Sequence, residues 1–186
     1  MRRVCSFAAS LLSATVLLGA PANFYAATAC ESSLPFNIDT GILEPIAIAL
    51  LRQSPTFRQQ CQRIAAAASA VRVQVRVVRR LYPGGRAETV MRRYDAGALH
   101  AEVSLEFGGD YGELLAHEFE HVLEQMEHVN LRQLPPVQAW VTPDGAFETQ
   151  RAMDIGTRAR QEREPLAAEA VEANRRAAPL QRDPIE

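Results

Sequence analysis

The sequence predicts an α+β fold in which a small antiparallel sheet of about three strands packs on two later helices, with further helices at the N-terminus. Apolar residues follow helical spacing up to about residue 68, alternate with polar residues between 71 and 107, and return to helical spacing after residue 110. Short turns containing Gly or Pro separate the alternating segments. The chain of 186 residues is 47% hydrophobic and 23% charged, which suits one globular domain.

Charge and residue usage exclude some classes of function. The formal net charge is -2, so the chain lacks the strong positive charge typical of nucleic-acid-binding proteins, and no nucleic-acid partner is expected. All 20 basic residues are Arg, which excludes lysine Schiff bases and phosphate loops that depend on lysine.

The first 29 residues have the pattern of a secretory signal peptide. Arg2 and Arg3 form a positive start, residues 4–18 form a short apolar run, and residues 27–29 match the A-x-A cleavage pattern. The alternative is an uncleaved membrane anchor, but a membrane span needs about 20 apolar residues and this run is shorter. We therefore expect a secreted or periplasmic protein with no membrane span.

The cysteines leave two alternatives open. Cys5 lies in the signal peptide, so Cys30 and Cys61 remain in the exported chain. An even number of cysteines in an exported protein favours a disulfide between them. Cys30 directly follows the expected cleavage site, so a lipid-modified Cys30 is the alternative. A lipidated Cys30 could not also form a disulfide with Cys61.

Two helices are expected before the sheet. Residues 34–43 follow no regular pattern, whereas residues 44–52 are apolar with helical spacing. Ser54 and Pro55 interrupt this helix and begin a second one that runs towards Ala68, because Pro is well placed in the first turn of a helix.

Three strands follow these helices. Residues 71–78, 87–94 and 99–107 each have strand-like patterns, and turns at 82–85 and 95–97 connect them. Because the turns are short, we expect consecutive strands to pair as an antiparallel meander.

Two helices and a tail complete the predicted domain. Asp110 and Glu113 form a capping box and begin a helix that runs to about His128. Residues 142–144, Thr-Pro-Asp, begin a second helix that runs to about Gln161. The expected organisation is a signal peptide at 1–29, a single domain at 30–163 and a helical or disordered tail at 164–186.

The first of these later helices carries a motif with metal-binding chemistry. His117 and His121 are four positions apart, so both imidazoles project from one helix face and can reach one ion. Glu118 lies about 100° round the helix from His117, beside the ion rather than on it. A carboxylate there can take a proton from metal-bound water, whose pKa zinc lowers to about 7.

The spacing also gives this helix two distinct faces. One stripe is apolar and is expected to pack on the sheet, whereas the opposite stripe gathers three of the four His residues of the chain. The alternative is an ordinary solvent-exposed polar face. His128 lies about 16 Å along the axis from His117, too far to bind the same ion. The apolar stripe comprises Leu115, Phe119, Val122, Met126 and Val129, and the polar one His117, His121, Glu124 and His128.

A catalytic zinc site needs a third protein ligand and an open fourth position. Glu148 is the favoured candidate, because it would lie on the next helix in a stripe of small residues with Ala152 and Ala159, where a carboxylate needs a partner. The alternative is an exposed acid in the first turn of that helix. Asp144 and Asp154 are the remaining candidates. The expected ligands of Zn²⁺ are therefore His117, His121 and Glu148.

Residues 114–122, Leu-Leu-Ala-His-Glu-Phe-Glu-His-Val, followed by Ala-Phe-Glu at 146–148, resemble the zincin metallopeptidases, and the gluzincin branch in particular. The similarity covers roughly residues 70–160. It implies a minimal zincin scaffold with an active-site helix and a second, ligand-bearing helix. The resemblance implies these roles: zinc ligands His117, His121 and Glu148, and general base Glu118.

The sequence departs from the family pattern at a few positions. Glu120 stands where an uncharged residue is usual, and Ala152 stands where gluzincins often carry an Asp that orients a His. Glu124 and Glu127 occupy the Gly and His positions of the metzincin continuation. Residues 164–186 contain no Tyr or His that could stabilise an oxyanion.

These features predict a secreted zinc-dependent metallopeptidase that hydrolyses peptide bonds of peptide or protein substrates, with a zinc-bound water and Glu118 as general base. The alternative is a catalytically inactive zincin-like domain of the cell envelope that binds a partner or holds a structural metal, which the missing oxyanion donor favours. A third interpretation is an envelope protein with a chance motif.

We also expect residues 99–107 to form an open edge strand that pairs with the substrate backbone, because this strand leads directly into the motif helix. The alternative places it at the centre of the sheet, with partners on both sides.

Overall fold

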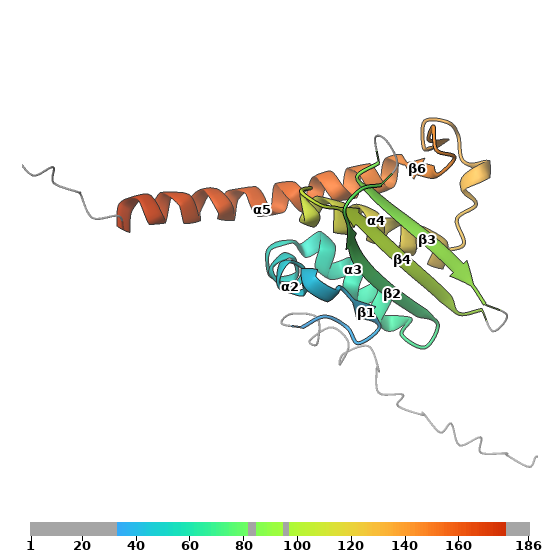
Figure 1. Cartoon of the computed structure of the whole chain (residues 1–186), viewed down its shortest axis with the longest axis horizontal. Coiled ribbons are helices and arrows are strands. Elements are labelled where there is room, and N and C mark those ends of the chain that lie inside the picture. Colours follow the sequence, from blue (N-terminus) through green and yellow to red (C-terminus); the bar gives the residue numbers. More distant parts are fainter. Residues whose placement is uncertain (1–32, 82–84, 95–96, 178–186) are drawn as a thin grey trace, which may run out of the picture.

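The computed structural model describes residues 33–81, 85–94 and 97–177, and the side chains of these residues up to Arg163. Helices pack on one face of a four-stranded sheet, and the last helix, α5 (Gln150–Ala177), extends beyond the rest of the fold (Figure 1). The predicted α+β class is confirmed. The expected signal peptide and Cys30 lie outside the described residues, so cleavage, lipidation and a disulfide to the buried Cys61 stay predictions.

The two N-terminal helices form as the sequence predicts. They are α2 (Glu44–Gln53) and α3 (Pro55–Ala66). The hydroxyl of Ser54 accepts a hydrogen bond from the backbone N–H of Phe57 at 3.0 Å, so Ser54 caps α3 while the following Pro occupies its first turn. The segment before α2 contains a two-residue strand, β1 (Ile38–Asp39), and a 3₁₀ turn, η1 (Gly41–Leu43).

The main sheet differs from the predicted antiparallel meander of three strands. It has four strands in the order β1-β2-β4-β3, with β2 at Val71–Val78, β3 at Ala87–Arg93 and β4 at Leu99–Glu106. The pairs β1–β2 and β2–β4 are parallel, and only β3–β4 is antiparallel. The sheet is therefore mixed and mostly parallel.

The physical reason lies in the connection between β2 and β3. The connection of residues 79–86 is long enough to span two strand spacings of about 4.8 Å each. The strand β3 can therefore lie two positions from β2, and β4 then fills the position between them. Composition favours this order, because β4 buries Leu99, Ala101, Val103 and Leu105, whereas β3 carries charged residues that suit an edge strand.

The prediction that residues 99–107 form an open edge is wrong. Residues of β4 pair with β2 on one side and with β3 on the other along their whole length. The alternative interpretation, a central strand, is the correct one. Within the described residues, the free edge beside the motif helix belongs to β3 instead.

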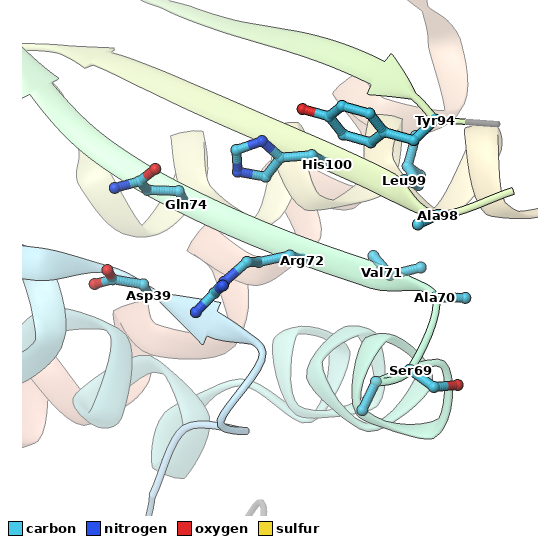
Figure 2. Close-up of a pocket in the computed structure, with 11 residues that line it drawn as sticks. Asp39, Ser69, Ala70, Val71, Arg72, Gln74, Tyr94, Ala98, Leu99 and His100 are labelled. Atoms are coloured by element: carbon cyan, nitrogen blue, oxygen red, sulfur yellow. The ribbon is translucent and has the colours of Figure 1, made fainter. Parts of the chain in front are cut away.

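The two faces of the sheet have different characters. Alternate side chains of β2 and β4 enter the core under the helices, whereas the intervening ones, such as Arg72 and His100, project from the opposite, polar face (Figure 2). The motif helix and the polar face are thus separated by the sheet.

The motif helix is α4 (Tyr111–Met126). The carboxylate of Asp110 accepts hydrogen bonds from the backbone N–H groups of Gly112 and Glu113, at 3.0 and 3.2 Å, so Asp110 caps the helix as predicted. The apolar stripe is buried in the core, where Phe119 stacks on Phe57 with ring centroids 5.2 Å apart. This packing fixes the direction in which the polar stripe points.

The predicted helix start at residues 142–144 is wrong. These residues belong to the turn of a hairpin formed by β5 (Ala139–Val141) and β6 (Phe147–Thr149). Gly145 has a φ of 87°, and the N–H of Thr142 donates to the carbonyl of Ala146 at 2.9 Å. The run Pro143-Asp144-Gly145 favours a turn, because Gly adopts a positive φ without strain. Glu148 therefore lies on a strand and not on a helix.

None of the helices among the described residues combines the length and the apolar character that crossing a membrane requires.

Candidate metal centre

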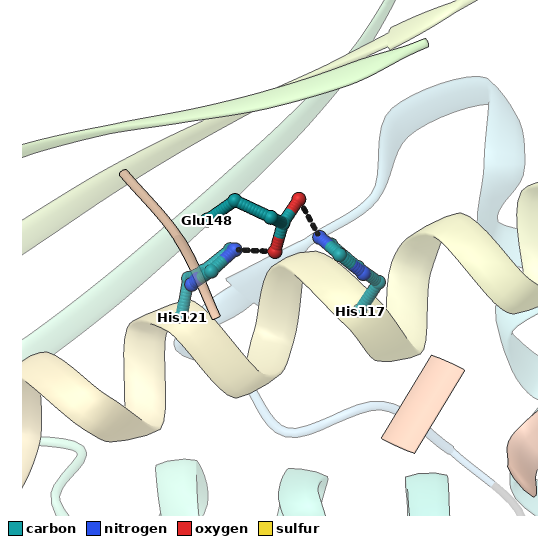
Figure 3. A group of neighbouring side chains, drawn as sticks. All are labelled: His117, His121 and Glu148. Atoms are coloured by element: carbon teal, nitrogen blue, oxygen red, sulfur yellow. Dashed lines mark ion pairs between the residues drawn. The ribbon is translucent and has the colours of Figure 1, made fainter. Parts of the chain in front are cut away.

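Two helical turns and one short strand bring three metal-binding side chains together. His117 and His121 project from α4 towards the carboxylate of Glu148 on β6 (Figure 3). Nε2 of His117 lies 3.2 Å from Oε2 of Glu148, and Nε2 of His121 lies 3.4 Å from Oε1. One ligand atom from each residue can be chosen so that all lie within 4.8 Å of one another, and this group could hold a metal ion.

The donor atoms of the group are those that bind metal ions in proteins. The two imidazoles face different oxygens of Glu148, so the carboxylate lies between both rings. Two imidazole nitrogens and one carboxylate oxygen also form a donor set used by hydrolytic zinc enzymes, which leave the fourth position open. The residues predicted as ligands thus meet at one point, although Glu148 arrives from a hairpin.

A buried carboxylate orients His121. Oε2 of Glu124 lies 2.9 Å from Nδ1 of His121, which leaves Nε2 of that ring facing Glu148. The other oxygen of Glu124 accepts a hydrogen bond from the Thr149 hydroxyl at 2.8 Å, and this hydroxyl also accepts the backbone N–H of Ala152 at 3.0 Å. Glu124 therefore supplies the carboxylate–histidine contact that holds metal-binding imidazoles in place.

Position 152, where the resemblance noted above would place an Asp, holds a fully buried Ala152. The carboxylate that contacts His121 comes from α4 itself. The sequence placed Glu124 on the same stripe as the two His residues. Its spacing of three from His121 was the available signal, since residues i and i+3 on a helix are neighbours.

Glu118 occupies a position beside the ligand group. The Thr89 hydroxyl on β3 donates to Oε2 of Glu118 at 2.6 Å, and Oε1 lies 3.9 Å from Nε2 of His117. Only 3% of Glu118 is exposed. One carboxylate oxygen is thus anchored by the sheet, and the other lies nearer the ligand group.

The pKa values reflect this crowding of acids and imidazoles. Burial raises the pKa of Glu118, although His117 and His121 oppose that shift. Burial would lower the pKa of His121, but its hydrogen bonds with Glu124 and Glu148 outweigh this effect and raise the pKa to about 10. Burial would raise the pKa of Glu148, but hydrogen bonds from both imidazoles hold that pKa well below its usual range. Without a metal, the group therefore retains a proton on His121 at neutral pH.

The acidic residue at position 120 has a structural explanation. Glu120 is 3% exposed and accepts hydrogen bonds from the side-chain amide of Gln60, at 2.7 Å, and from Nε of Arg151, at 2.6 Å. Arg151 also pairs with Glu127 at 2.5 Å. These contacts join α3, α4 and α5 behind the ligand group, so Glu120 serves the packing of the helices.

A glycine allows α5 to approach α4 beside the ligands. A Cβ atom placed on Gly156 would lie 3.1 Å from the carbonyl oxygen of Glu113 and 3.1 Å from Cβ of His117. Both neighbours belong to the rigid turns of α4, so a larger residue would push the two helices apart. The small stripe that the sequence indicated, with Ala152 and Ala159 fully buried, is therefore present on α5.

The other candidates lie elsewhere. Asp144 sits in the hairpin turn, where it accepts a hydrogen bond from the Thr142 hydroxyl. Asp154 accepts a hydrogen bond from the side-chain amide of Gln150 at 2.8 Å. His128 is exposed beyond the end of α4. None of these three belongs to the group that could hold a metal among the described residues.

Searches of protein-family models, of curated proteins and of solved structures found no match for this chain.

Proposed function

We propose that the protein is a zinc-dependent metallopeptidase in which His117, His121 and Glu148 bind the ion and Glu118 is the general base. The observation that carries this proposal is the convergence of the three ligand side chains beside a buried, anchored carboxylate. A bound zinc ion would supply an activated water and polarise the carbonyl of the scissile peptide bond.

Glu118 accepts the proton of the attacking water and passes it to the leaving amine. Its burial raises its pKa, which makes its carboxylate a stronger base than an exposed glutamate. The hydrogen bond from Thr89 fixes the carboxylate, so the proton reaches Oε1 on the side of the ligand group.

The free edge of β3 is the surface on which the substrate would bind. Thr89 connects this strand to Glu118, so the edge runs beside the ligand group. The N–H of Glu106 donates to the carbonyl of Arg86, and hydrogen-bonded pairs alternate along an antiparallel ladder. The backbone N–H groups of Thr89 and Met91 therefore face away from β4. An extended peptide can pair with them by main-chain hydrogen bonds.

A structural metal site is the second candidate function. Glu148 precedes Thr149, which caps α5 and contacts Glu124 on α4. An ion bound there would tie the hairpin, α4 and α5 together without any reaction. Under this alternative, Glu118 contributes nothing beyond its hydrogen bond to Thr89.

Export is part of the proposal. The pattern of residues 1–29 supports a secreted or periplasmic location, where an unfolded or extended polypeptide would be the substrate.

The decisive experiment compares Glu118→Gln with His117→Ala. We expect the unmodified protein and Glu118→Gln each to hold about one zinc, because Glu118 is not a ligand, whereas His117→Ala loses most of it. Hydrolysis of fluorescein-labelled casein should fall by about 10²–10⁴-fold in Glu118→Gln. Glu88→Gln, which changes a β3 carboxylate on the other face of the sheet, is the matched control and should keep full activity.

Equal hydrolysis by Glu118→Gln and the unmodified protein would contradict the proposed mechanism. Full zinc content with no hydrolysis in the unmodified protein would favour the structural metal. Loss of zinc from Glu118→Gln but not from His117→Ala would reverse the assignment of roles.

A further inference from the structure

A pocket opens on the polar face of the sheet, opposite α4 and the group formed by His117, His121 and Glu148. It has a volume of about 510 Å³ and lies where β2 and β4 begin, beside the turn that follows α3. This volume falls in the range of about 300–1,000 Å³ that small-molecule sites occupy. Polar side chains and small apolar residues both contribute to its lining, among them Asp39, Arg72, Gln74, Tyr94, Ala98 and His100.

A row of three basic side chains crosses the sheet at this pocket. Arg72 on β2 lies directly opposite His100 on β4, and His100 lies directly opposite Arg92 on β3. Side chains opposite one another in a sheet project from the same face, with Cβ atoms about 4.5–5.5 Å apart. The two guanidinium groups carry permanent positive charge on this face of the sheet and would attract a negative charge.

The described part of the protein does not supply that charge. Arg72, His100 and Arg92 make no side-chain hydrogen bond or ion pair with any residue that the structure describes. The acid in the neighbouring row, Glu102, is already paired with Arg76. Asp39 borders the pocket, but it accepts the N–H of its neighbour Gly41 and forms no ion pair with Arg72.

The free donors point to the chemistry of a ligand. The side chains of Arg72, Gln74, His100 and Tyr94 project to the same side of the sheet, with Arg72 between Asp39 and His100 (Figure 2). A guanidinium group binds a carboxylate or a phosphate through two parallel hydrogen bonds. The imidazole and the phenol hydroxyl provide further donors. Small apolar residues such as Ala98 leave space for an organic group.

We propose that this pocket binds a small organic anion through its carboxylate or phosphate group, with Arg72 and His100 as the main contacts and Arg92 contributing charge at the border. The organic part of the ligand lies against the small apolar residues. The site is independent of the proposed peptidase activity, because the sheet separates it from His117, His121 and Glu148.

The test uses the metal-free protein and two probes, phenyl phosphate and benzoate, with phenol as the neutral comparison. Binding is followed by NMR through the imidazole signal of His100, one of four His residues in the chain. We expect a saturable shift with a dissociation constant of about 1 mM or lower for at least one anion, and none with phenol. Addition of zinc should leave this constant unchanged.

The variants locate the contact. Arg72→Gln should weaken binding about tenfold or more, since it removes a charge-assisted hydrogen-bond pair. Arg79→Gln is the matched control, because Arg79 follows the other end of β2, and it should change the constant less than about twofold. His100→Gln, followed by backbone amide signals, should weaken binding in the same direction as Arg72→Gln.

Two vesicle preparations, one of phosphatidylglycerol and one of phosphatidylcholine, distinguish a lipid headgroup from a free anion. Binding to the anionic vesicles alone, lost in Arg72→Gln, would overturn the small-molecule proposal in favour of a membrane surface. An unsaturable shift of His100, or equal binding by Arg72→Gln and Arg79→Gln, would show an ordinary solvated face and would also overturn it.

Discussion

At the scale of single residues, Glu124 is the buried carboxylate that contacts the possible metal-binding group through His121. It is 2% exposed and joins His121 to Thr149. A buried carboxylate with two partners of this kind fixes the ring plane and the tautomer of a ligand. The effect of Glu124 on metal affinity can be measured without any knowledge of the substrate.

We expect Glu124→Ala to weaken zinc binding by about 10–100-fold while His121 stays in the chain. The variant leaves Nδ1 of His121 and the hydroxyl of Thr149 without their carboxylate partner. Competition with a chromophoric chelator measures the affinity. Glu113→Gln, which removes a carboxylate from an exposed pair with Arg160 on the same helix, is the control. An unchanged affinity in Glu124→Ala would show that Glu124 does not support the ligand.

Zinc affinity should rise with pH. Because hydrogen bonds raise the pKa of His121 in the metal-free protein to about 10, an incoming ion must displace a proton from this ring. Between pH 6 and 8 the apparent affinity should increase about tenfold per pH unit, and calorimetry in buffers of different ionisation enthalpy should detect one released proton. A pH-independent affinity in this range would contradict the proton on His121.

The same shift affects the stability of the metal-free protein in the opposite direction. The folded pKa of His121 lies above the ordinary value of 6.5, so its contribution is fully present below that value. The contribution is lost as the pH rises from 6.5 towards 10. Raising the pH in this range therefore removes the contribution of His121 to the metal-free fold while it favours zinc binding.

The sequence was sufficient to predict that His117, His121 and Glu148 lie together, but not the contacts that surround them. The spacing of His117 and His121 specifies one helix face, and that face determines where both imidazoles point. The hydrogen bond between Thr89 and Glu118 joins residues far apart in the chain, and no local pattern encodes it. Long-range contacts of this kind depend on the strand order, which was predicted incorrectly.

At the scale of the elements, the sequence predicted helix starts correctly where they depend only on residues close together in the chain. Ser54 and Asp110 cap their helices because the capping geometry involves only neighbouring residues. The hairpin was missed because Thr142-Pro143-Asp144 was interpreted as a helix start, although Gly145 completes a turn signal. The predicted grouping of Glu148 with His117 and His121 did not depend on this error, since the strand β6 also brings Glu148 to these two residues.

The position of β4 between β2 and β3 could not follow from short turns alone. Pairing of consecutive strands is the simplest assumption, but the burial of β4 and the exposure of β3 favour the observed order. Ser104 shows the result, since it is 2% exposed at a position that an edge strand would leave open. The parallel pairing with β2 requires information about the whole sheet.

Proline substitutions should separate the central strand from the edge strand. Met91→Pro removes an N–H that faces away from β4, so the variant should fold but lose binding of a peptide to the metal-loaded protein. Val103→Pro removes a donor from the central strand and should prevent folding. Circular dichroism reports the folding, and fluorescence anisotropy of a labelled peptide, measured in the Glu118→Gln background, reports the binding.

Retained peptide binding in a folded Met91→Pro variant would remove β3 from the proposed substrate surface. It would leave the assignment of the zinc ligands unaffected, because Met91 contacts none of them in the described interactions.

At the scale of the whole molecule, we expect the exported protein to begin at Cys30. The positive start, the short apolar run and the A-x-A pattern of residues 1–29 support cleavage there. N-terminal sequencing and intact-mass measurement of the exported fraction test this, and the mass also distinguishes a lipidated Cys30 from an unmodified one. A chain that still begins at Met1 in that fraction would contradict the expected cleavage.

The place of β4 in the sheet also determines when this protein can fold. The ribosome completes β4 after both of its neighbours, so β2 and β3 each wait with an unpaired inner edge until residue 106 is available. Unpaired strand edges are templates for pairing with other chains, and of the native pairings in this sheet only the two-residue pairing of β1 with β2 can form before β4. The nascent chain therefore acquires most of its sheet in one late step and depends until then on whatever keeps it from aggregating.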